Sequence, residues 1–531
     1  MRQPQAGEMS VRASVHALMR ELGMTTVFGN PGSTELRFLS GWPADFRYVM
    51  ALHEGASVAM ADAYAQIGRN AAFVNLHSAG GLGNALGTLF TAYRNAAPLV
   101  IVAGQQTRAM LPSEPFLFAT DAATFPKPYV KWSVEPARAE DVPGAIARAY
   151  HVAMERPYGP AFVSIPEDDW QRVAEPPPMR RIESEFVASA EALRAVASAL
   201  DASTAPALVV GAGVDRDDAS DAAVLLAERL GARVWASALS GRCGFPEDHP
   251  LFAGALPRER NGVVEQLRGH DVIVVLGAPV FNYHVHKEGP FLPDRANLFQ
   301  LTDDPNLASY AVAGTSIITS LRPALEALLR LLQRSRAAAL PSRTFGGAFA
   351  GDPMTIPYLL QTVRETLPPS AIICEEAPSI HSTLHDAGLL QPGRYLSATS
   401  GSLGYGLPAA IGAALAAPGR PVLALIGDGS SLYAIQALWT AAQYALPIVF
   451  VIVNNGGYGA MKSFSRMMTA GGAPSFEIPG VDFVAAAVSF GVRAMRVSQS
   501  ADFPAVMTEA FAAGVPVLLD VPIDASFQKV R

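Results

Sequence analysis

The strongest constraint on the fold lies near the C-terminal end of the chain. The apolar run Val422–Ile426 leads into the turn Gly427-Asp428-Gly429-Ser430 and then into a helical pattern over Leu432–Tyr444. A second apolar run, Ile448–Val453, follows and ends at Asn454-Asn455. This order predicts two buried parallel strands joined by a right-handed helical crossover. Both strands then end at the same edge of the sheet, where open α/β sheets bind their ligands.

The polar residues at this edge suit a metal ion and a phosphate group. Asp428 offers a carboxylate, Asn455 offers a carboxamide oxygen, and Ser430 lies at the start of a helix, whose N-terminus attracts anions. We therefore expect Mg²⁺ or Ca²⁺ together with phosphate here. An ordinary surface turn would explain Gly-Asp-Gly by itself, because both residue types favour turns. The Asn-Asn pair after the next strand makes the metal interpretation more specific.

Short apolar runs and helical patterns alternate along the whole chain. We expect strands at 26–28, 48–52, 72–76, 99–103, 161–165, 207–211, 234–236, 272–276, 371–374, 422–426 and 448–453. We expect helices at 10–22 (with Ser10 as N-cap), 55–67, 84–93, 141–154, 219–230, 322–332, 407–416 and 432–444. This alternation predicts an α/β protein of three doubly wound domains with mostly parallel sheets. The expected domains are 1–175, 188–335 and 355–531, with linkers near 175–178 and at 336–354.

The middle domain carries part of a dinucleotide-binding motif. Gly211-Ala212-Gly213 follows an expected strand and precedes a helix, but Arg216 stands where the third glycine of the motif belongs. We therefore expect a Rossmann-like domain with a structural role. A nicotinamide-binding site is the weaker alternative.

Composition disfavours several classes of protein. Half of the 531 residues are apolar and the net charge is −7, which argues against disorder and against a nucleic-acid partner. Cys243 and Cys374 are far apart in sequence and form no metal-binding motif, which fits a cytoplasmic protein. The N-terminus has no signal-peptide pattern, and Pro408 and Pro421 interrupt the apolar stretch Leu403–Ile426, so we expect no membrane association.

Three strand-to-helix turns in the first domain carry polar residues. They contain Asn30-Pro31-Gly32-Ser33, His53-Glu54 and His77. Each residue has a structural alternative, since Ser33 suits an N-cap, Glu54 suits the positive end of a helix dipole, and a single His77 after a strand is usually structural. Together, however, the turns lie at the carboxyl ends of strands and favour a ligand site.

Longer segments support that interpretation. They are FGNPGSTEL, ALHEGASVAMADAYA, NLHSAGGLGNALG, AGQQTRAM, VKWSVEPA, LGAPVFNYH, GDGSSLYAIQALWTAAQY and NNGGYGA. In these segments the chain resembles the thiamin diphosphate-dependent 2-oxo acid decarboxylases, and among them the benzoylformate decarboxylases. The resemblance runs through nearly the whole chain. It implies that the first domain binds the pyrimidine ring of the cofactor and that the third binds its diphosphate.

The resemblance implies thiamin diphosphate and Mg²⁺ (or Ca²⁺) as cofactors, and the decarboxylation of a small aromatic 2-oxo acid to an aldehyde. It implies catalytic roles for Glu54 at the aminopyrimidine N1′, for His77 and His284 in proton transfer, and for Ser33 at the substrate carboxylate. It implies metal ligands from Asp428, Asn455 and the Gly457 carbonyl. The implied cofactor contacts are Asn30, Pro31, Gly32, Glu54, Ser379, Gly401, Leu403, Gly427, Asp428, Gly429, Ser430, Asn455 and Tyr458. The implied substrate pocket contains Phe116, Leu117, Ser397, Met461 and Phe464.

Two segments depart from the family pattern. Ala377-Pro378 stands where such enzymes carry hydroxyl residues near the diphosphate, so Ser379 or His381 would have to compensate. Ser397 stands where a benzoylformate decarboxylase carries an aromatic residue. We therefore expect a wider or more polar pocket, and the departure puts the identity of the acid in question more than the decarboxylation.

The resemblance also implies a homotetramer built as a dimer of dimers, in which Glu54 of one subunit completes the site around Asp428 and Asn455 of another. A carboligase of the acetolactate synthase type is the alternative enzyme, since it would use the same cofactor. The histidines at 77 and 284 favour protonation and hence the decarboxylase. A non-catalytic cofactor-binding homologue is disfavoured because these acidic, amide and imidazole residues are all present.

Overall fold

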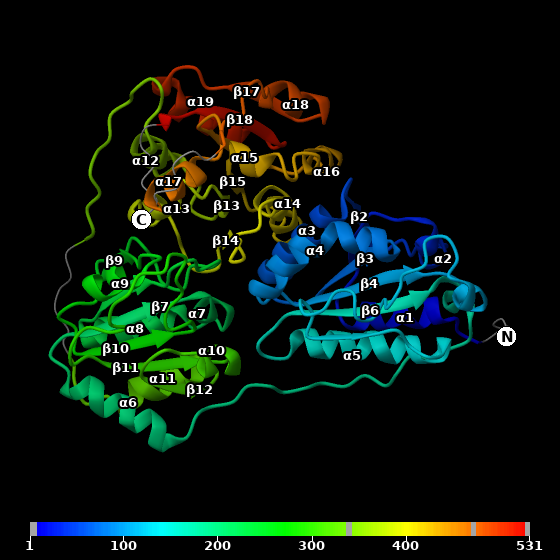
Figure 1. Ribbon diagram of the computed structural model, residues 1–531, viewed down its shortest axis with the longest axis horizontal. Coiled ribbons are helices and arrows are strands. Elements are labelled where there is room, and N and C mark those ends of the chain that lie inside the picture. Colours follow the sequence, from blue (N-terminus) through cyan, green and yellow to red (C-terminus); the bar gives the residue numbers. More distant parts are fainter. Residues whose placement is uncertain (1–7, 336–341, 469–473, 526–531) are drawn as a thin grey trace.

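The computed structural model describes residues 8–335, 342–468 and 474–525, which form three α/β units (Figure 1). Each unit has one six-stranded sheet, and all paired strands in the three sheets are parallel. The prediction of three doubly wound α/β domains is therefore confirmed. No helix among the described residues has the length and apolar character needed to cross a bilayer.

The first sheet has the strand order β2-β1-β3-β4-β6-β5. Its strands are β1 (Thr26–Gly29), β2 (Arg47–Met50), β3 (Ala72–Leu76), β4 (Leu99–Gln105), β5 (Trp132–Val134) and β6 (Pro160–Pro166). The helices around it are α1 (Val11–Glu21), α2 (Leu36–Leu39), α3 (Glu54–Gly68), α4 (Ser78–Arg94) and α5 (Val142–Met154). The Ser10 side chain accepts a hydrogen bond from the Ala13 N–H, so the predicted N-cap of the first helix is confirmed.

The second sheet has the order β12-β11-β10-β7-β8-β9. Its strands are β7 (Pro206–Val210), β8 (Arg233–Ala236), β9 (Phe252–Ala255), β10 (Val272–Leu276), β11 (Asn297–Thr302) and β12 (Thr315–Ile318). Its helices are α6 (Ala190–Ala202), α7 (Ala212–Arg216), α8 (Ser220–Leu230), α9 (Arg260–Gln266), α10 (Pro305–Ser309) and α11 (Leu321–Leu331). The partial dinucleotide motif has a packing role, because a Cβ at Gly213 would overlap the backbone of Gly277, just after β10.

The third sheet has the order β14-β13-β15-β16-β18-β17. Its strands are β13 (Ile372–Glu376), β14 (Tyr395–Ser397), β15 (Val422–Gly427), β16 (Ile448–Asn454), β17 (Arg493–Arg496) and β18 (Val517–Pro522). Its helices are α12 (Ile356–Thr366), α13 (His381–Asp386), α14 (Gly406–Ala416), α15 (Asp428–Ser431), α16 (Ala437–Gln443), α17 (Gly459–Met467), α18 (Phe483–Ser489) and α19 (Phe503–Ala512).

The helix predicted over Leu432–Tyr444 is wrong in its first part. A short helix, α15, begins at Asp428, and the chain then passes through turns until α16 starts at Ala437. In these turns the Tyr433 N–H bonds to the carbonyl three residues back, and the Ser431 hydroxyl bonds to the Asp428 carbonyl. Such local bonds replace the α-helical ladder.

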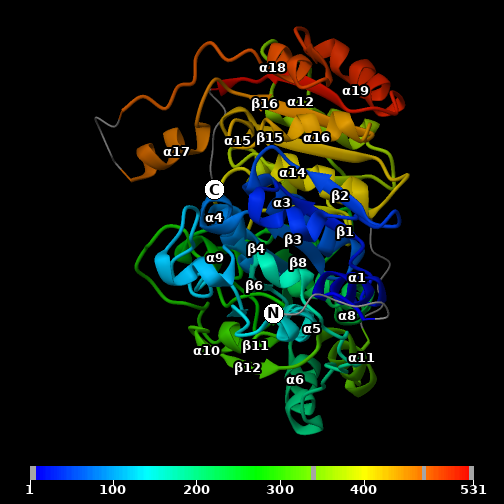
Figure 2. The same ribbon diagram turned by 90° about the vertical axis from the view of Figure 1, so that its right-hand side faces the viewer.

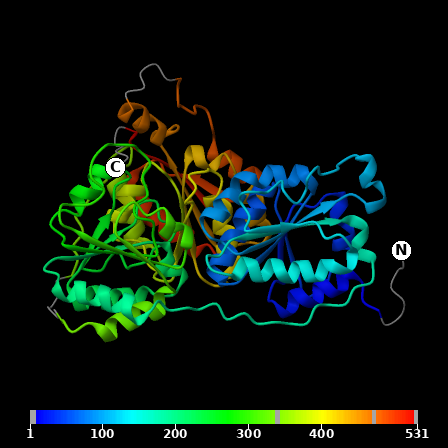
Figure 3. The same ribbon diagram turned by 60° about the horizontal axis from the view of Figure 1, so that its bottom comes forward.

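Two segments without helix or strand join the units. Residues 174–189 run from the first unit to α6 along the outside of the molecule (Figure 3). Residues 332–335 and 342–355 belong to the connection between α11 and α12. Of the expected linker 336–354, residues 336–341 lie outside the described part of the chain.

Two buried helices, α3 and α14, hold the first and third units together (Figure 2). Most side chains of both helices are buried, and many of them are small. A Cβ at Gly412 in α14 would overlap the carbonyl oxygen of Met60 in α3, so the two backbones touch at this point. One continuous cluster of buried apolar side chains therefore extends from the first sheet to the third.

A buried polar network fixes the same contact. The Asp62 carboxylate in α3 accepts hydrogen bonds from the Tyr405 hydroxyl at 2.8 Å, from Gln66 at 2.5 Å and from Asn95 at 3.2 Å. Burial raises the pKa of Asp62 to about 6, although these hydrogen bonds favour its charged form. Because Tyr405 directly precedes α14, the network also fixes the start of that helix.

Gly412→Ala should lower the free energy of unfolding by about 1–3 kcal/mol, because the added methyl group forces α3 and α14 apart. Gly144→Ala in α5 is the matched control, since a Cβ there meets no atom within 4 Å. Alanine in that open helical position should be neutral or stabilising by up to ~1 kcal/mol. Urea titrations followed by circular dichroism compare the two. Equal midpoints for Gly412→Ala and the unaltered chain would contradict the packing argument.

Candidate active site

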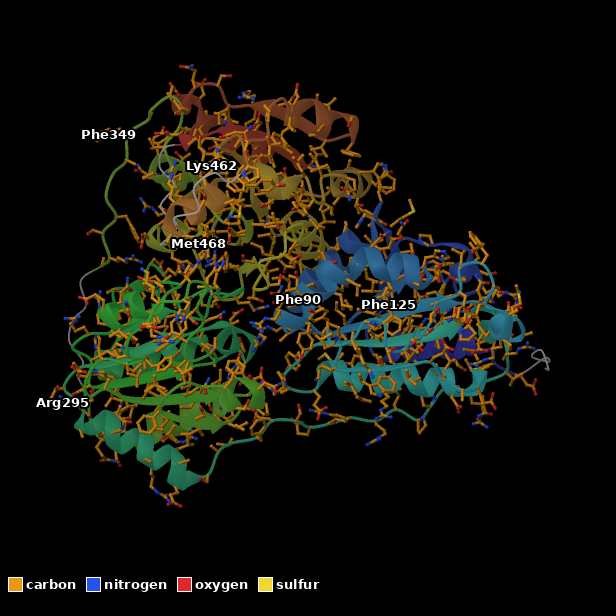
Figure 4. All side chains as sticks on the ribbon, in the orientation of Figure 1. Phe90, Phe125, Arg295, Phe349, Lys462 and Met468 are labelled. Atoms are coloured by element: carbon orange, nitrogen blue, oxygen red, sulfur yellow. The ribbon has the colours of Figure 1, made fainter. Side chains whose placement is uncertain are left out.

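A cavity of about 610 Å³ lies where the second and third units meet α4 of the first, a size typical of small-molecule sites. Phe90 on α4 lines it and is labelled at this junction in Figure 4. The predicted site residues in its lining are His284, Ser379, Ser397, Gly401, Leu403, Gly427, Asp428, Gly429, Ser430, Asn455, Gly457, Tyr458, Met461 and Phe464. The predicted residues that do not line it are Asn30, Pro31, Gly32, Ser33, Glu54, His77, Phe116 and Leu117.

One part of the cavity offers oxygen ligands to a cation. Asp428 follows β15 and Asn455 follows its neighbour β16, and the Gly457 N–H donates to Asp428 Oδ2 at 2.7 Å. Asn455 Nδ2 donates to Ser379 Oγ at 3.3 Å, whereas its buried Oδ1 has no partner among the described residues. An orphaned oxygen beside a carboxylate is what a hard divalent cation would satisfy. The residues present therefore fit the expected metal.

The burial of Asp428 also favours a cation at this position, because a cation would offset the cost of burying the carboxylate charge. Burial raises the pKa of Asp428, although the N–H groups of Gly429 and Gly457 favour the charged carboxylate. Among the described residues, no group of three or more His, Cys, Asp or Glu side chains is arranged for a metal. A cation here would therefore depend on amide and carbonyl oxygens as well as on one carboxylate.

The loop that carries Leu403 is fixed by one residue of the first unit and by one residue of its own unit. Asn95 of the first unit accepts hydrogen bonds from the Thr399 N–H at 3.1 Å and from its hydroxyl at 2.7 Å. Glu376, at the end of β13, accepts from the Gly404 N–H at 2.6 Å. Glu376 was not singled out in the sequence analysis. Its contact holds the loop and so keeps Leu403 in the cavity wall.

A second buried carboxylate that the sequence analysis missed, Glu375, lines the same cavity. It accepts hydrogen bonds from the Ala377 N–H at 2.6 Å, His381 Nδ1 at 2.9 Å, the Tyr395 hydroxyl at 3.0 Å and the Ser397 hydroxyl at 3.0 Å. Burial alone would raise the pKa of Glu375, but His381 and these donors lower it to about 2. Glu375 is therefore ionised, and the polar groups of His381 and Ser397 are directed to it.

His284 reaches the cavity from the second unit. Its backbone N–H donates to the Arg258 carbonyl at 2.8 Å, and its ring centroid lies 4.4 Å from that of Phe464 in α17. In Figure 2, α17 projects from the third unit. Burial lowers the pKa of His284, and the charge of Arg258 lowers it further. The imidazole is therefore predominantly neutral at neutral pH.

Glu54 belongs to a second group of predicted residues, at the carboxyl edge of the first sheet. It is the first residue of α3 and is buried. Its Oε1 accepts a hydrogen bond from Asn30 Nδ2 at 3.3 Å, and its Oε2 accepts one from Asn84 Nδ2 at 3.0 Å. The carboxylate is thus fixed in one orientation by two amide groups, of which Asn84 was not predicted.

His77, at the same edge, is paired with a buried acid that the sequence analysis missed. Its Nδ1 lies 2.9 Å from Glu35 Oε2 and 3.0 Å from Thr34 Oγ1. Glu35 also accepts hydrogen bonds from the N–H groups of Gly32 at 2.8 Å and Gly104 at 3.1 Å. The hydrogen bond to Glu35 raises the pKa of His77 and outweighs the opposing effect of burial.

Ser33, Phe116 and Leu117 lie near this second group. Ser33 begins the 3₁₀ turn that contains Glu35 and is exposed, and Phe116 is 88% exposed. The Ser78 hydroxyl, next to His77, donates to the Leu117 carbonyl at 2.5 Å, so the loop with Leu117 borders His77. In a single chain the predicted residues therefore form two groups, and only the group around Asp428 lines the large cavity.

Another cavity, of about 520 Å³, lies in the first unit beside Arg108 and Arg172. Arg108 pairs with Asp169 at 2.7 Å, and Arg172 pairs with Asp168 at 3.2 Å. None of the predicted site residues lines this cavity. Its cations are already paired, so it is the weaker candidate for a catalytic site.

Three family models match successive parts of the chain. "Thiamine pyrophosphate enzyme, N-terminal TPP binding domain" matches residues 9–123 and "Thiamine pyrophosphate enzyme, central domain" matches 193–328. "Thiamine pyrophosphate enzyme, C-terminal TPP binding domain" matches residues 381–521. The three models follow the order of the three sheets along the chain.

Individual proteins match over nearly their full length. The benzoylformate decarboxylase of Pseudomonas aeruginosa is 42% identical over 524 residues, which cover 97% of this chain and 98% of that protein. The thiamine diphosphate-dependent 4-hydroxybenzoylformate decarboxylase of Rhodococcus jostii RHA1 superposes with a TM-score of 0.94 at 43% identity, covering 97% of this chain and 99% of its own. The benzoylformate decarboxylase of Polynucleobacter necessarius superposes with a TM-score of 0.94 at 39% identity, covering 98% and 99%.

Glu35→Gln should lower the pKa of His77, because the carboxylate that favours the imidazolium is removed. The raised pKa of His77 also stabilises the folded state. This contribution is fully present below about pH 6.5, the pKa of an unperturbed histidine, and is lost as the pH rises through the raised value. Nuclear magnetic resonance of ¹⁵N-histidine-labelled protein across the neutral range measures the titration. His151 on α5 provides the internal control. A His77 titration unchanged by Glu35→Gln would refute the pairing.

Proposed function

The chain belongs to the thiamine pyrophosphate enzymes, and on this basis we propose that it removes carbon dioxide from an aromatic 2-oxo acid of the benzoylformate type and leaves an aldehyde. The observation that carries the proposal is the 42% identity to a benzoylformate decarboxylase over 97% of the chain. The cavity supports it, because Phe464 and Met461 offer an apolar surface next to the imidazole of His284.

Thiamine pyrophosphate, also called thiamin diphosphate, supplies when bound an electron sink for the charge left as carbon dioxide departs. Asp428, the orphaned Oδ1 of Asn455 and the Gly457 carbonyl would hold its diphosphate through Mg²⁺ or Ca²⁺. Ser430 in α15 lines the same cavity. Leu403, whose loop is tied down at both ends, would support the rings of the cofactor.

Glu54 would hold and transfer a proton at the aminopyrimidine nitrogen. The side chain is buried, and Asn30 and Asn84 fix both carboxylate oxygens. A carboxylate held in this way exchanges a strong, directed hydrogen bond with a ring nitrogen. The amide groups thus orient the acid without neutralising it.

Of the two histidines, His77 would donate a proton and His284 would accept one. Glu35 raises the pKa of His77, which makes it the better proton donor at neutral pH. Burial and Arg258 lower the pKa of His284, which makes it the better proton acceptor. Two titratable groups whose surroundings move their pKa values apart are suited to acid and base roles in one reaction. Ser33 would bind the substrate carboxylate beside them.

The complete site would form between two chains, within a homotetramer built from dimers. In one chain the Glu54 group does not line the cavity around Asp428. Leu36, Met50 and Leu52, which lie next to this group in sequence, are exposed apolar side chains. Burial of these side chains against a second chain would be favourable and would bring the two groups together.

Glu54→Gln should reduce carbon dioxide release by about 100-fold or more, because the acid that moves the pyrimidine proton is lost. The assay supplies thiamin diphosphate and Mg²⁺ with benzoylformate, phenylpyruvate, pyruvate or a branched aliphatic 2-oxo acid. Calorimetry should show that cofactor binding largely survives. Glu140→Gln, at an exposed position of the same unit, is the control.

Other outcomes of this assay discriminate between functions. Release from a different acid would keep the reaction and change the substrate. Condensation products with an added aldehyde or a second 2-oxo acid would favour a carboligase. A wild-type chain that binds cofactor but releases no carbon dioxide from any of the acids would contradict the proposal.

Mixing Glu54→Gln chains with Asp428→Ala chains tests the two-chain site. If each site combines Glu54 of one chain with Asp428 of the other, a mixed dimer contains one site with both residues intact. Random re-association of equal amounts should then restore about a quarter of wild-type activity. A site within one chain would give no recovery, because each chain is defective. Each variant alone serves as the control.

A further inference from the structure

Arg258 is a cationic residue in the wall of the large cavity, and the proposed reaction gives it no role. It lies between β9 and α9 of the second unit and lines the cavity. Within residues 8–335, 342–468 and 474–525, its guanidinium forms no hydrogen bond or ion pair. A guanidinium has five donors in a fixed plane, so an unpaired one in a cavity is able to bind a ligand oxygen.

The position of Arg258 assigns it to the substrate rather than to the diphosphate. Its carbonyl accepts hydrogen bonds from the N–H groups of His284 at 2.8 Å and Val285 at 3.2 Å, so the backbone beside Arg258 holds the catalytic imidazole. The His284 ring in turn contacts Phe464. Glu375 and Tyr395 of the third unit also act electrostatically on Arg258. Arg258 therefore lines the same cavity as His284 and Glu375, next to the first and under the electrostatic influence of the second.

The Glu375 cluster, which consists of Glu375 with His381, Tyr395 and Ser397, determines which kind of ligand oxygen Arg258 is able to bind. Glu375 accepts four hydrogen bonds and is a fixed negative charge in the cavity wall. A second anion brought to Arg258 would be repelled by this carboxylate in a poorly solvated space. A neutral oxygen acceptor, such as a phenol hydroxyl, avoids that repulsion and still gains a charge-assisted hydrogen bond from the guanidinium.

We infer that Arg258 is a specificity residue that donates a hydrogen bond to a neutral oxygen on the ring of the substrate, so that ring-hydroxylated aryl 2-oxo acids are preferred. The inference rests on the proposed function and deepens it. Ser397 contributes because a small side chain whose hydroxyl is bound to Glu375 leaves the cavity open toward this polar wall. An unsubstituted ring would leave the guanidinium without a partner, which costs affinity.

The test compares kcat/KM for benzoylformate and for its 3-hydroxy, 4-hydroxy and 4-carboxy derivatives. The wild-type holoenzyme should prefer one hydroxylated acid and discriminate against the 4-carboxy acid. In Arg258→Gln the ratio of the preferred hydroxylated acid to benzoylformate should fall about 10-fold or more, and Arg258→Lys should restore part of it. Arg260→Gln is the matched control, because Arg260 bonds to the Gly289 carbonyl at 3.0 Å and does not line the cavity.

Any other result would overturn the inference, and each such result would identify a different role for Arg258 or for the chain. An equal loss for all four acids would mean that Arg258 binds their common carboxylate. A loss of thiamin diphosphate affinity by calorimetry would make it a cofactor contact. A preference for the 4-carboxy acid that Arg258→Gln removes would show that it binds an anion. Activity of the wild type with an unchanged ratio in Arg258→Gln refutes the inference alone, whereas no release from any acid refutes the proposed function.

Discussion

The rest of the structure depends on the close contact between α3 and α14. Each helix begins at the carboxyl edge of its own sheet, α3 with Glu54 and α14 just after the loop that carries Leu403. The contact of the Gly412 region with the Met60 backbone therefore fixes the relative position of the two ligand-binding edges. Small side chains allow the close approach, and the buried Asp62 network orients it. A change in this packing would move both halves of the candidate site at once.

Buried carboxylate–imidazole pairs set the charges around both halves. Glu35 with His77, Glu375 with His381, and Glu247 with His385 all lie within hydrogen-bond distance. A buried carboxylate is costly unless hydrogen-bond donors surround it, and an imidazole next to it offsets that cost. The effect on the pKa values differs between the pairs. Glu35 raises the pKa of His77, whereas Glu375 keeps its own charge because backbone and hydroxyl groups also donate to it.

Sequence patterns predicted the interior strands well and the outer strands poorly. β3 and β10 have the expected bounds, because continuous apolar runs are needed where both faces of a parallel sheet are covered. The strands that were missed, β5, β9, β11, β12, β14, β17 and β18, lie at a sheet edge or next to one. β17, with the sequence RAMR, is only half-buried, and its pairing depends on β18, a partner distant in sequence. Local pattern does not encode such a partner.

The sequence by itself determined the fold class and the residue types of the candidate site, because a strand–turn–helix unit places the polar residues of its turn at a known edge of the sheet. Asp428, Asn455, Glu54 and His77 were recognisable for that reason. The partners of these residues were decided only by the tertiary structure. Glu35 reaches His77 from the turn after β1, and Asn84 reaches Glu54 from within α4. Arg258 of the second unit is influenced by the charge of Glu375 in the third. Such contacts join residues that are far apart in the chain. The spacing of these residues in the sequence follows no period or motif, so the contacts are not predictable from it.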